Sequence, residues 1–153
     1  MRVALGLVMV VNGAAKIFGV GPETVTLGGV EAGFAAGVTP FAGFLGSIGV
    51  PLPGVMAWVV TLVEFLGGLF VLLGVLTRLS GALITVNMLV ATYLVHLQNG
   101  WPSGNGGFEY TMVLALLGIA VVLSGPGRLS VEQSVLGREL LPNILLSGGG
   151  SPT

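Results

Sequence analysis

Long apolar runs, separated by short clusters of glycine, proline and polar residues, make up most of the chain. A helix that crosses a bilayer needs about 20 mostly apolar residues. Runs of about this length predict transmembrane helices at about residues 2–18, 54–76, 79–97 and 108–124. The second run follows a V-P-L-P breaker, and the fourth ends at G-P-G, which favours a helix stop.

The segment between the first two predicted helices, residues 19–53, is too apolar for a free solvated loop and too rich in glycine for another span. We expect it to be re-entrant or to lie in the membrane interface. Within it, Thr39 as N-cap and Pro40 at the first helical position predict a short helix near residues 40–48.

The part after the fourth helix, residues 129–153, is predicted to be a separate cytoplasmic region behind a transmembrane domain at residues 2–128. The S-V-E-Q sequence at residues 130–133 is typical of a capping box and predicts an amphipathic helix to about Leu140. The glycine- and serine-rich end favours a flexible tail.

The composition supports a membrane protein. Of the 153 residues 54% are apolar and only 7% are charged, with a mean hydropathy of +1.03. Soluble domains average roughly 25% charged residues. The sequence therefore predicts an all-α integral membrane protein. We expect a four-helix bundle that is embedded in the lipid bilayer. A net charge of −1 argues against nucleic acid as a partner, and the absence of cysteine excludes iron–sulfur clusters and thiolate metal sites.

The basic residues predict how the helices cross the membrane. Lysine and arginine are enriched in cytoplasmic loops. Arg2, Arg78, Arg128 and Arg138 all fall on one side of the predicted spans, and only Lys16 lies near the other. We therefore expect both termini on the cytoplasmic side.

Glu64 is an ionisable residue near the middle of the second predicted helix. A charge at that depth costs roughly 2.5–3.5 kcal/mol on the insertion scale, so such a residue is a functional candidate by default. Thr61 and Gly68 put it on a small, polar face suited to close helix packing. The alternative is a protonated glutamic acid that is hydrogen-bonded to a neighbouring helix.

Asn12 and Lys16 share one face of the first predicted helix, four residues apart. Lys16 lies near the outer end, where its ammonium group can simply reach the interface. The sharper hypothesis is an ion pair with Glu64 or Glu109 across the bundle. Both residues are candidates for ligand binding.

The loop between the third and fourth helices begins at His96 and ends at Glu109, which we expect to be neighbours. One interpretation is a proton-handling pair, with the adjacent Tyr93 as a further cofactor-binding candidate. The other is an interfacial histidine and a glutamate that suits the positive end of its helix. A single histidine cannot provide bis-histidine haem ligation, and a His–Glu pair lacks further metal ligands, so no haem or metal site is predicted.

Three motif-bearing stretches follow one another along the chain, namely R-V-A-L-G-L-V-M-V-V-N-G-A-A-K at 2–16, F-L-G-S-I-G-V-P at 44–51 and V-E-F-L-G-G-L-F-V-L-L-G-V-L-T-R at 63–78. His96, Glu109 and the G-P-G-R-L-S stretch at 125–130 come after them. Over about residues 2–133 this order and spacing resemble the DoxX family of small four-helix bacterial and archaeal membrane proteins. The polar positions that match the family are Lys16, Glu64, Arg78, His96 and Glu109. Many members carry histidine where this chain has Asn12.

The resemblance implies a quinone-linked redox role in sulfur-compound oxidation or oxidative stress, because the related DoxD proteins are subunits of a thiosulfate:quinone oxidoreductase. Under this hypothesis Glu64, His96 and Glu109 handle protons, Lys16 orients a carbonyl or an anion, and a partner subunit supplies electrons. The expected location is a prokaryotic cytoplasmic membrane, with several crossings.

The rival hypothesis is a non-catalytic accessory subunit that packs against a larger respiratory or oxidase complex and stabilises it. The many glycines suit contacts between helices, either with other membrane subunits or with further copies of this chain. A small transporter is a third option, although so few polar groups leave little room for a hydrated path.

Overall fold

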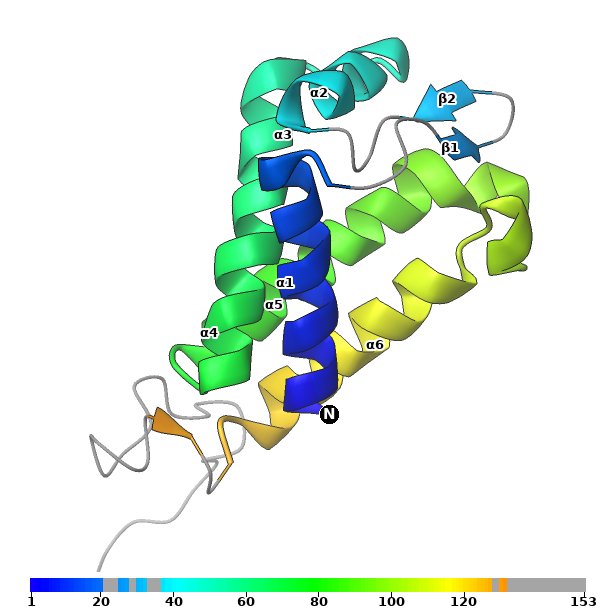
Figure 1. The fold of residues 1–153 in the computed structure, drawn as a ribbon. Coiled ribbons are helices and arrows are strands. Elements are labelled where there is room, and N and C mark those ends of the chain that lie inside the picture. The colour runs from blue at the N-terminus through cyan, green and yellow to red at the C-terminus, as the bar shows by residue number, and fades with distance from the viewer. Residues whose placement is uncertain (21–24, 28–29, 33–36, 128–129, 132–153) are drawn as a thin grey trace, which may run out of the picture.

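The computed structural model of the chain describes residues 1–20, 25–27, 30–32, 37–127 and 130–131. These residues are predominantly helical (Figure 1). The bulk consists of long helical segments packed side by side, with a short helix and a hairpin at one end. We call this the α2 end, after that short helix, and the opposite end the arginine end.

Two continuous helical segments are long and apolar enough to cross a membrane within the described part of the chain. The first has 21 residues and joins α3 (Pro53–Leu62), the π-helical turn η1 (Val63–Gly67) and α4 (Gly68–Leu73). At about 1.5 Å per residue, 21 residues match the roughly 30 Å of bilayer hydrocarbon.

The second such segment has 23 residues and joins α5 (Thr77–Ala91), the π-helical turn η2 (Thr92–His96) and the 3₁₀ turn η3 (Leu97–Asn99). It begins two residues earlier than the sequence suggested. Arg78, expected in the preceding turn, is therefore the second residue of α5.

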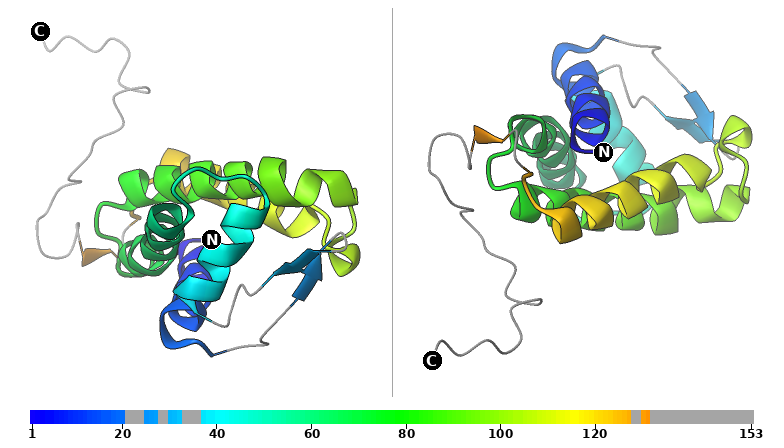
Figure 2. Two further views of the ribbon diagram at one scale, coloured as in Figure 1. Left: turned by 90° about the horizontal axis from the view of Figure 1, so that it is seen from above. Right: turned by 90° about the horizontal axis from the view of Figure 1, so that it is seen from below.

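Two shorter helices pack against these two long segments. α1 (Arg2–Phe18) has 17 residues and α6 (Glu109–Ser124) has 16. α5 packs along α6, and α1 packs along α4 and η1 (Figure 2). A loop that contains the short turn η4 (Ser103–Asn105) connects η3 to α6.

Glycines allow α1 to approach its neighbours closely. A Cβ atom built on Gly13 would lie 2.5 Å from the Phe65 backbone nitrogen, and one on Gly6 would lie 2.8 Å from the Leu72 nitrogen. From the opposite side, a Cβ on Gly68 would lie 2.7 Å from Met9 Cβ. These close crossings hold the polar end of α1 against η1, where Glu64 lies.

The buried core divides into two clusters along the molecule. The larger one lies between the long helices and is formed by Leu5, Met9, Val71, Ile84, Met88, Leu114, Ala115 and Val121. The smaller one lies at the α2 end and is formed by Phe41, Phe44, Leu45, Ala57 and Val95. Outside both, large apolar side chains are exposed along each long helix, as expected for surfaces that face lipid.

The α2 end contains a hairpin and a helix. β1 (Val25–Leu27) pairs antiparallel with β2 (Val30–Ala32), and this hairpin was not expected from the sequence. α2 (Val38–Ser47) is the short helix that the sequence placed near residues 40–48. The predicted cap was wrong: α2 begins after Gly37, whose φ of 116° suits glycine. Pro40 is tolerated because first-turn N–H groups have no intrahelical partner.

The arginine end is closed by bonds to the end of α6. Arg2 donates to the Pro126 carbonyl, and Arg78 donates to the carbonyls of Val122 and, at 3.3 Å, Leu123. Two of the arginines that the sequence placed on one side of the membrane thus lie together. Arg128, Arg138 and the amphipathic helix predicted after Ser130 lie outside the described residues, except for Ser130 and Val131.

Candidate functional site

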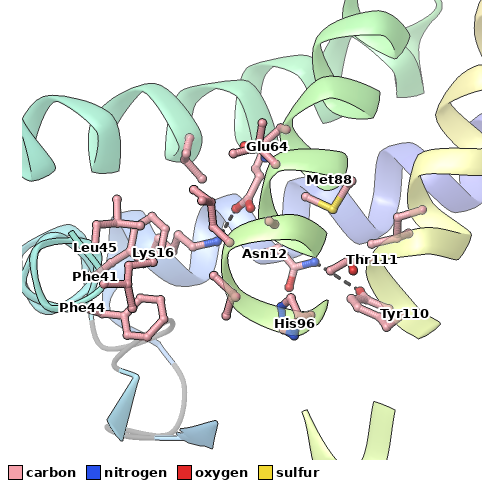
Figure 3. A pocket seen from close by; sticks show the side chains of 18 residues that line it. Asn12, Lys16, Phe41, Phe44, Leu45, Glu64, Met88, His96, Tyr110 and Thr111 are labelled. Carbon is pink, nitrogen blue, oxygen red and sulfur yellow. Dashed lines mark hydrogen bonds and ion pairs between the residues drawn. The ribbon is translucent and has the colours of Figure 1, made fainter. Parts of the chain in front are cut away.

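A cavity of about 290 Å³ lies beneath α2, between α1, η1, α5, η2 and α6 (Figure 3). Its apolar wall comes mainly from α2 and from α5. Its polar wall collects side chains that are far apart in the sequence, namely Asn12, Lys16, Glu64, Asn87, His96, Tyr110 and Thr111. Four candidates from the sequence therefore meet in one cavity, and two do not.

Lys16 and Glu64 form a buried ion pair in the wall of this cavity. The Lys16 ammonium donates to Glu64 Oε2, and the two residues are only 7% and 5% exposed. Of the two alternatives for Lys16, the structure shows the ion pair rather than an ammonium group at the interface. Such a buried pair is held together because each charge alone would be strongly disfavoured in an apolar core.

α2 covers the lysine. The Lys16 ammonium lies 5.1 Å from the centre of the Phe41 ring, within the range of a cation–π contact. Because Phe41 also belongs to the core cluster at the α2 end, α2 shields the ion pair from the aqueous phase on that side.

Glu64 lies in η1, one of the two π-helical turns. π-helical turns inside α-helices occur frequently at functional sites. The neighbouring Thr61, which the sequence placed on the same face, donates to its own helix, to the Ala57 carbonyl at 2.7 Å. The polar groups that act on Glu64 come from Lys16 of α1, which donates to it, and from Asn87 of α5.

His96 ends η2, the second π-helical turn, and also lines the cavity. Its Nδ1 lies 2.7 Å from the Gly106 carbonyl, which Asn99 Nδ2 also contacts at 3.3 Å. A carbonyl can only accept, so Nδ1 carries a proton. In the neutral ring, Nε2 then has a free lone pair.

A hydroxyl pair holds η2 against α6. Thr92 Oγ1 and Thr111 Oγ1 are 2.7 Å apart and buried, and Thr92 also lies 2.8 Å from the Met88 carbonyl. This contact secures the turn that carries His96.

Glu109 lies outside the cavity lining, whereas His96 at the other end of the loop belongs to it. Its Oε2 accepts from the backbone N–H and the hydroxyl of Ser103, both at 3.2 Å. Glu109 is the first residue of α6, where a carboxylate also suits the positive end of the helix. The structure thus gives it a loop-holding position.

Asn12 and Tyr110 connect α1 to α6 across the cavity, with Asn12 Nδ2 3.4 Å from the Tyr110 hydroxyl. Tyr93, a cofactor-binding candidate from the sequence, is 73% exposed and does not line the cavity. Its place on η2 turns it toward the outer surface.

Asn87 of α5 is a further polar residue in the cavity lining. At about 100° per residue, positions nine apart lie on opposite sides of a straight α-helix. Asn87 and His96 nevertheless line the same cavity. The wider turn η2 advances less per residue and rotates His96 back toward that face. The signal in the sequence was an amide side chain in the middle of a predicted transmembrane helix.

Comparison with known proteins decides the family. The DoxX profile matches residues 1–97. The chain belongs to the DoxX family. The match includes every cavity-lining residue except those of α6, and it ends earlier than the residues 2–133 expected from the motifs.

A curated relative of this DoxX protein is the Bacillus subtilis (strain 168) protein named "Putative oxidoreductase CatD". It is 33% identical over 108 residues, which cover 67% of this chain and 77% of the relative. No solved structure matches the chain. Family membership and the two long apolar segments together identify a membrane-associated protein.

The cavity offers no obvious place for a metal ion. Among the described residues, no three histidine or acidic side chains lie close enough together to hold one. What the cavity offers is a set of hydrogen-bonding groups, with an ammonium group, two amides, an imidazole and a phenol facing an apolar wall. Such a site can bind an uncharged ring that carries oxygen atoms.

Proposed function

We propose that this DoxX protein is the membrane subunit of a quinone-linked oxidoreductase and that it binds the quinone in the cavity beneath α2. The observation that carries the proposal is the buried Lys16–Glu64 ion pair in the wall of that cavity. A charged pair inside an apolar helical core is costly, and in membrane proteins it typically marks a functional site. The relative named as an oxidoreductase supports the redox assignment.

The cavity dimensions fit a quinone head group. About 290 Å³ is near the lower limit for small-molecule sites, which suits a single ring. Val90, Leu94 and Tyr110 line the cavity and are also 42–49% exposed on the outer surface. A hydrocarbon tail can therefore extend from the ring into the lipid.

The polar residues have distinct roles under this proposal. The Lys16 ammonium has two N–H groups besides the one that Glu64 accepts, and these orient a ring carbonyl. His96 Nε2 can take a proton from a ring hydroxyl, because Nδ1 is already committed to Gly106. Glu64 holds the lysine side chain in place inside the core. A bound quinone supplies two-electron, two-proton chemistry, and a partner subunit delivers the electrons.

The proposal also includes the crossing of the membrane. We place four helical segments across a prokaryotic cytoplasmic membrane, with the arginine end inside and the α2 end outside. Arg2 and Arg78 at one end, and Lys16 and His96 toward the other, support this orientation.

The test is binding of a benzoquinone with a decyl tail to the purified protein in mild detergent. We expect a one-to-one complex by native mass spectrometry and a higher melting temperature at saturating ligand. Lys16→Met combined with Glu64→Gln removes the pair without leaving one charge unpaired, and it should weaken binding at least about tenfold.

The matched control is Ser124→Ala, at the arginine end, where the hydroxyl donates to the Ala120 carbonyl of its own helix. Unchanged binding is expected there. If the wild-type protein retains no quinone, or if the double variant binds it equally well, the proposal is wrong. An accessory subunit would then be the better assignment.

A further inference from the structure

The Asn87 amide nitrogen is buried and has no hydrogen bond of ordinary geometry to any residue that the structure describes. It belongs to α5 and lines the cavity that also contains Glu64 and Lys16. Buried polar groups in folded proteins are nearly always hydrogen-bonded, so an amide donor without a partner requires an explanation.

The surroundings of Asn87 show which way its amide points. Its amide interacts electrostatically with the Glu64 carboxylate. The amide oxygen and nitrogen look alike in shape, but a carboxylate would repel the oxygen. The nitrogen therefore faces the Glu64 side of the cavity. Glu64 Oε2 already accepts from Lys16, and the Asn87 amide nitrogen carries two N–H groups, so at least one of them is available to a ligand.

Other buried polar side chains near the cavity form hydrogen bonds within the protein. Thr85, two residues earlier on α5, donates to the Gly81 carbonyl at 2.8 Å, and Thr92 lies within bonding distance of Met88 and Thr111. Asn87 differs because it lines the cavity and its amide nitrogen has no such bond among the described residues.

We infer that Asn87 is a ligand-recognising residue that donates a hydrogen bond to an oxygen atom on the bound ring. The inference rests on the proposed quinone site. It identifies the ring oxygen as the group that the site recognises. Such a residue selects an oxygen-bearing ring over the corresponding hydrocarbon, because only the oxygen can satisfy the buried donor.

This role predicts opposite effects on stability and binding. In Asn87→Leu, a buried donor without a partner is replaced by an apolar side chain of similar size. The ligand-free protein should therefore melt at the same temperature or higher. Its affinity for the decyl benzoquinone should fall about tenfold, as expected for the loss of one buried hydrogen bond. A purely structural amide would lower the melting temperature instead.

The experiment measures melting temperature and quinone affinity for the wild type, Asn87→Leu and Asn87→Ala in the same detergent. Decylbenzene, which lacks the ring oxygens, is the matched ligand. Thr85→Val is the matched variant, because it removes a buried polar group of α5 that does not line the cavity. We expect unchanged quinone affinity in Thr85→Val and weak decylbenzene binding that Asn87 substitutions do not reduce.

The outcomes separate this inference from the proposed function. If the wild type binds no quinone, the proposed function is wrong and the inference falls with it. If the wild type binds quinone and both Asn87 variants bind it equally well, only the inference is wrong. It is also wrong if Asn87→Leu loses affinity only together with a lower ligand-free melting temperature. Should Asn87→Leu not fold, Asn87→Ala decides by quinone affinity measured against decylbenzene affinity, because a truncated side chain lowers the melting temperature in either case.

Discussion

The central feature at the scale of single residues is that Lys16 and Glu64 depend on one another. Each is almost completely buried, and each is the charge that makes the other tolerable. In an apolar core, removal of one partner is expected to cost more than removal of both, since the remaining charge has no compensation.

Lys16→Met or Glu64→Gln alone should each lower the free energy of unfolding by about 3–5 kcal/mol. The double variant should lose clearly less than the sum of the two. Chemical unfolding of all four proteins in one detergent gives the coupling free energy directly. Additive losses would show that the pair does not interact energetically.

Glu109→Gln tests the position that the structure gives this residue. Its carboxylate holds Ser103 and lies outside the cavity, so quinone affinity should stay within about twofold of the wild type. His96→Leu, which removes a cavity-lining group, should weaken binding. A large loss of affinity in Glu109→Gln would show that Glu109 contributes to quinone binding.

At the scale of elements, the site depends on how closely α1 approaches η1. Gly13 lies one helical turn from Lys16, and its missing side chain lets α1 touch the Phe65 backbone. The same contact brings Lys16 within reach of Glu64. The glycines of α1 thus help to place the Lys16–Glu64 ion pair and also allow the helices to pack closely.

Gly13→Ala should therefore destabilise the protein by about 1–3 kcal/mol, because the new Cβ would lie 2.5 Å from Phe65 nitrogen and the helices must separate. Gly43→Ala is the matched control in α2, where an added Cβ meets nothing within 4 Å. That change should be neutral or stabilising, since alanine favours a helix. Equal melting temperatures for the two variants would contradict the close packing of α1.

At the scale of the whole molecule, the protein has two chemically different ends. At the arginine end, Arg78 binds a carbonyl in the last turn of α6 and Arg2 binds one just after the helix, whereas the α2 end encloses the cavity. An oxidoreductase subunit with this polarity would receive its quinone from the bilayer and meet water-soluble partners at the ends.

Single cysteines can establish the orientation, because the chain has none of its own. Gly104→Cys lies in the loop before α6, where an added Cβ meets nothing within 4 Å, and Val75→Cys lies in the turn between α4 and α5. In intact cells stripped of any outer membrane, a membrane-impermeant maleimide should label Gly104→Cys only. Labelling of Val75→Cys only would reverse the proposed orientation.

The sequence by itself determined the class of protein. Its apolar runs and few charges predicted a helical membrane protein, its motifs predicted the DoxX family, and its rare polar residues identified Lys16, Glu64 and His96 as the positions to examine. These properties depend on local composition and spacing, which are visible in one dimension. The short helix α2 was predicted for the same reason, although its cap was misplaced by two residues.

Only the tertiary structure decided which of these residues meet. Spacing along one helix defines a face, but the neighbour of that face depends on packing between segments far apart in the chain. Lys16 could have paired with Glu64 or Glu109, and the glycine contacts of α1 select Glu64. The π-helical turn η2 changes the face on which His96 lies and brings it to the side of Asn87. Apolar patterning does not show such a turn or the Thr92–Thr111 contact that joins it to α6.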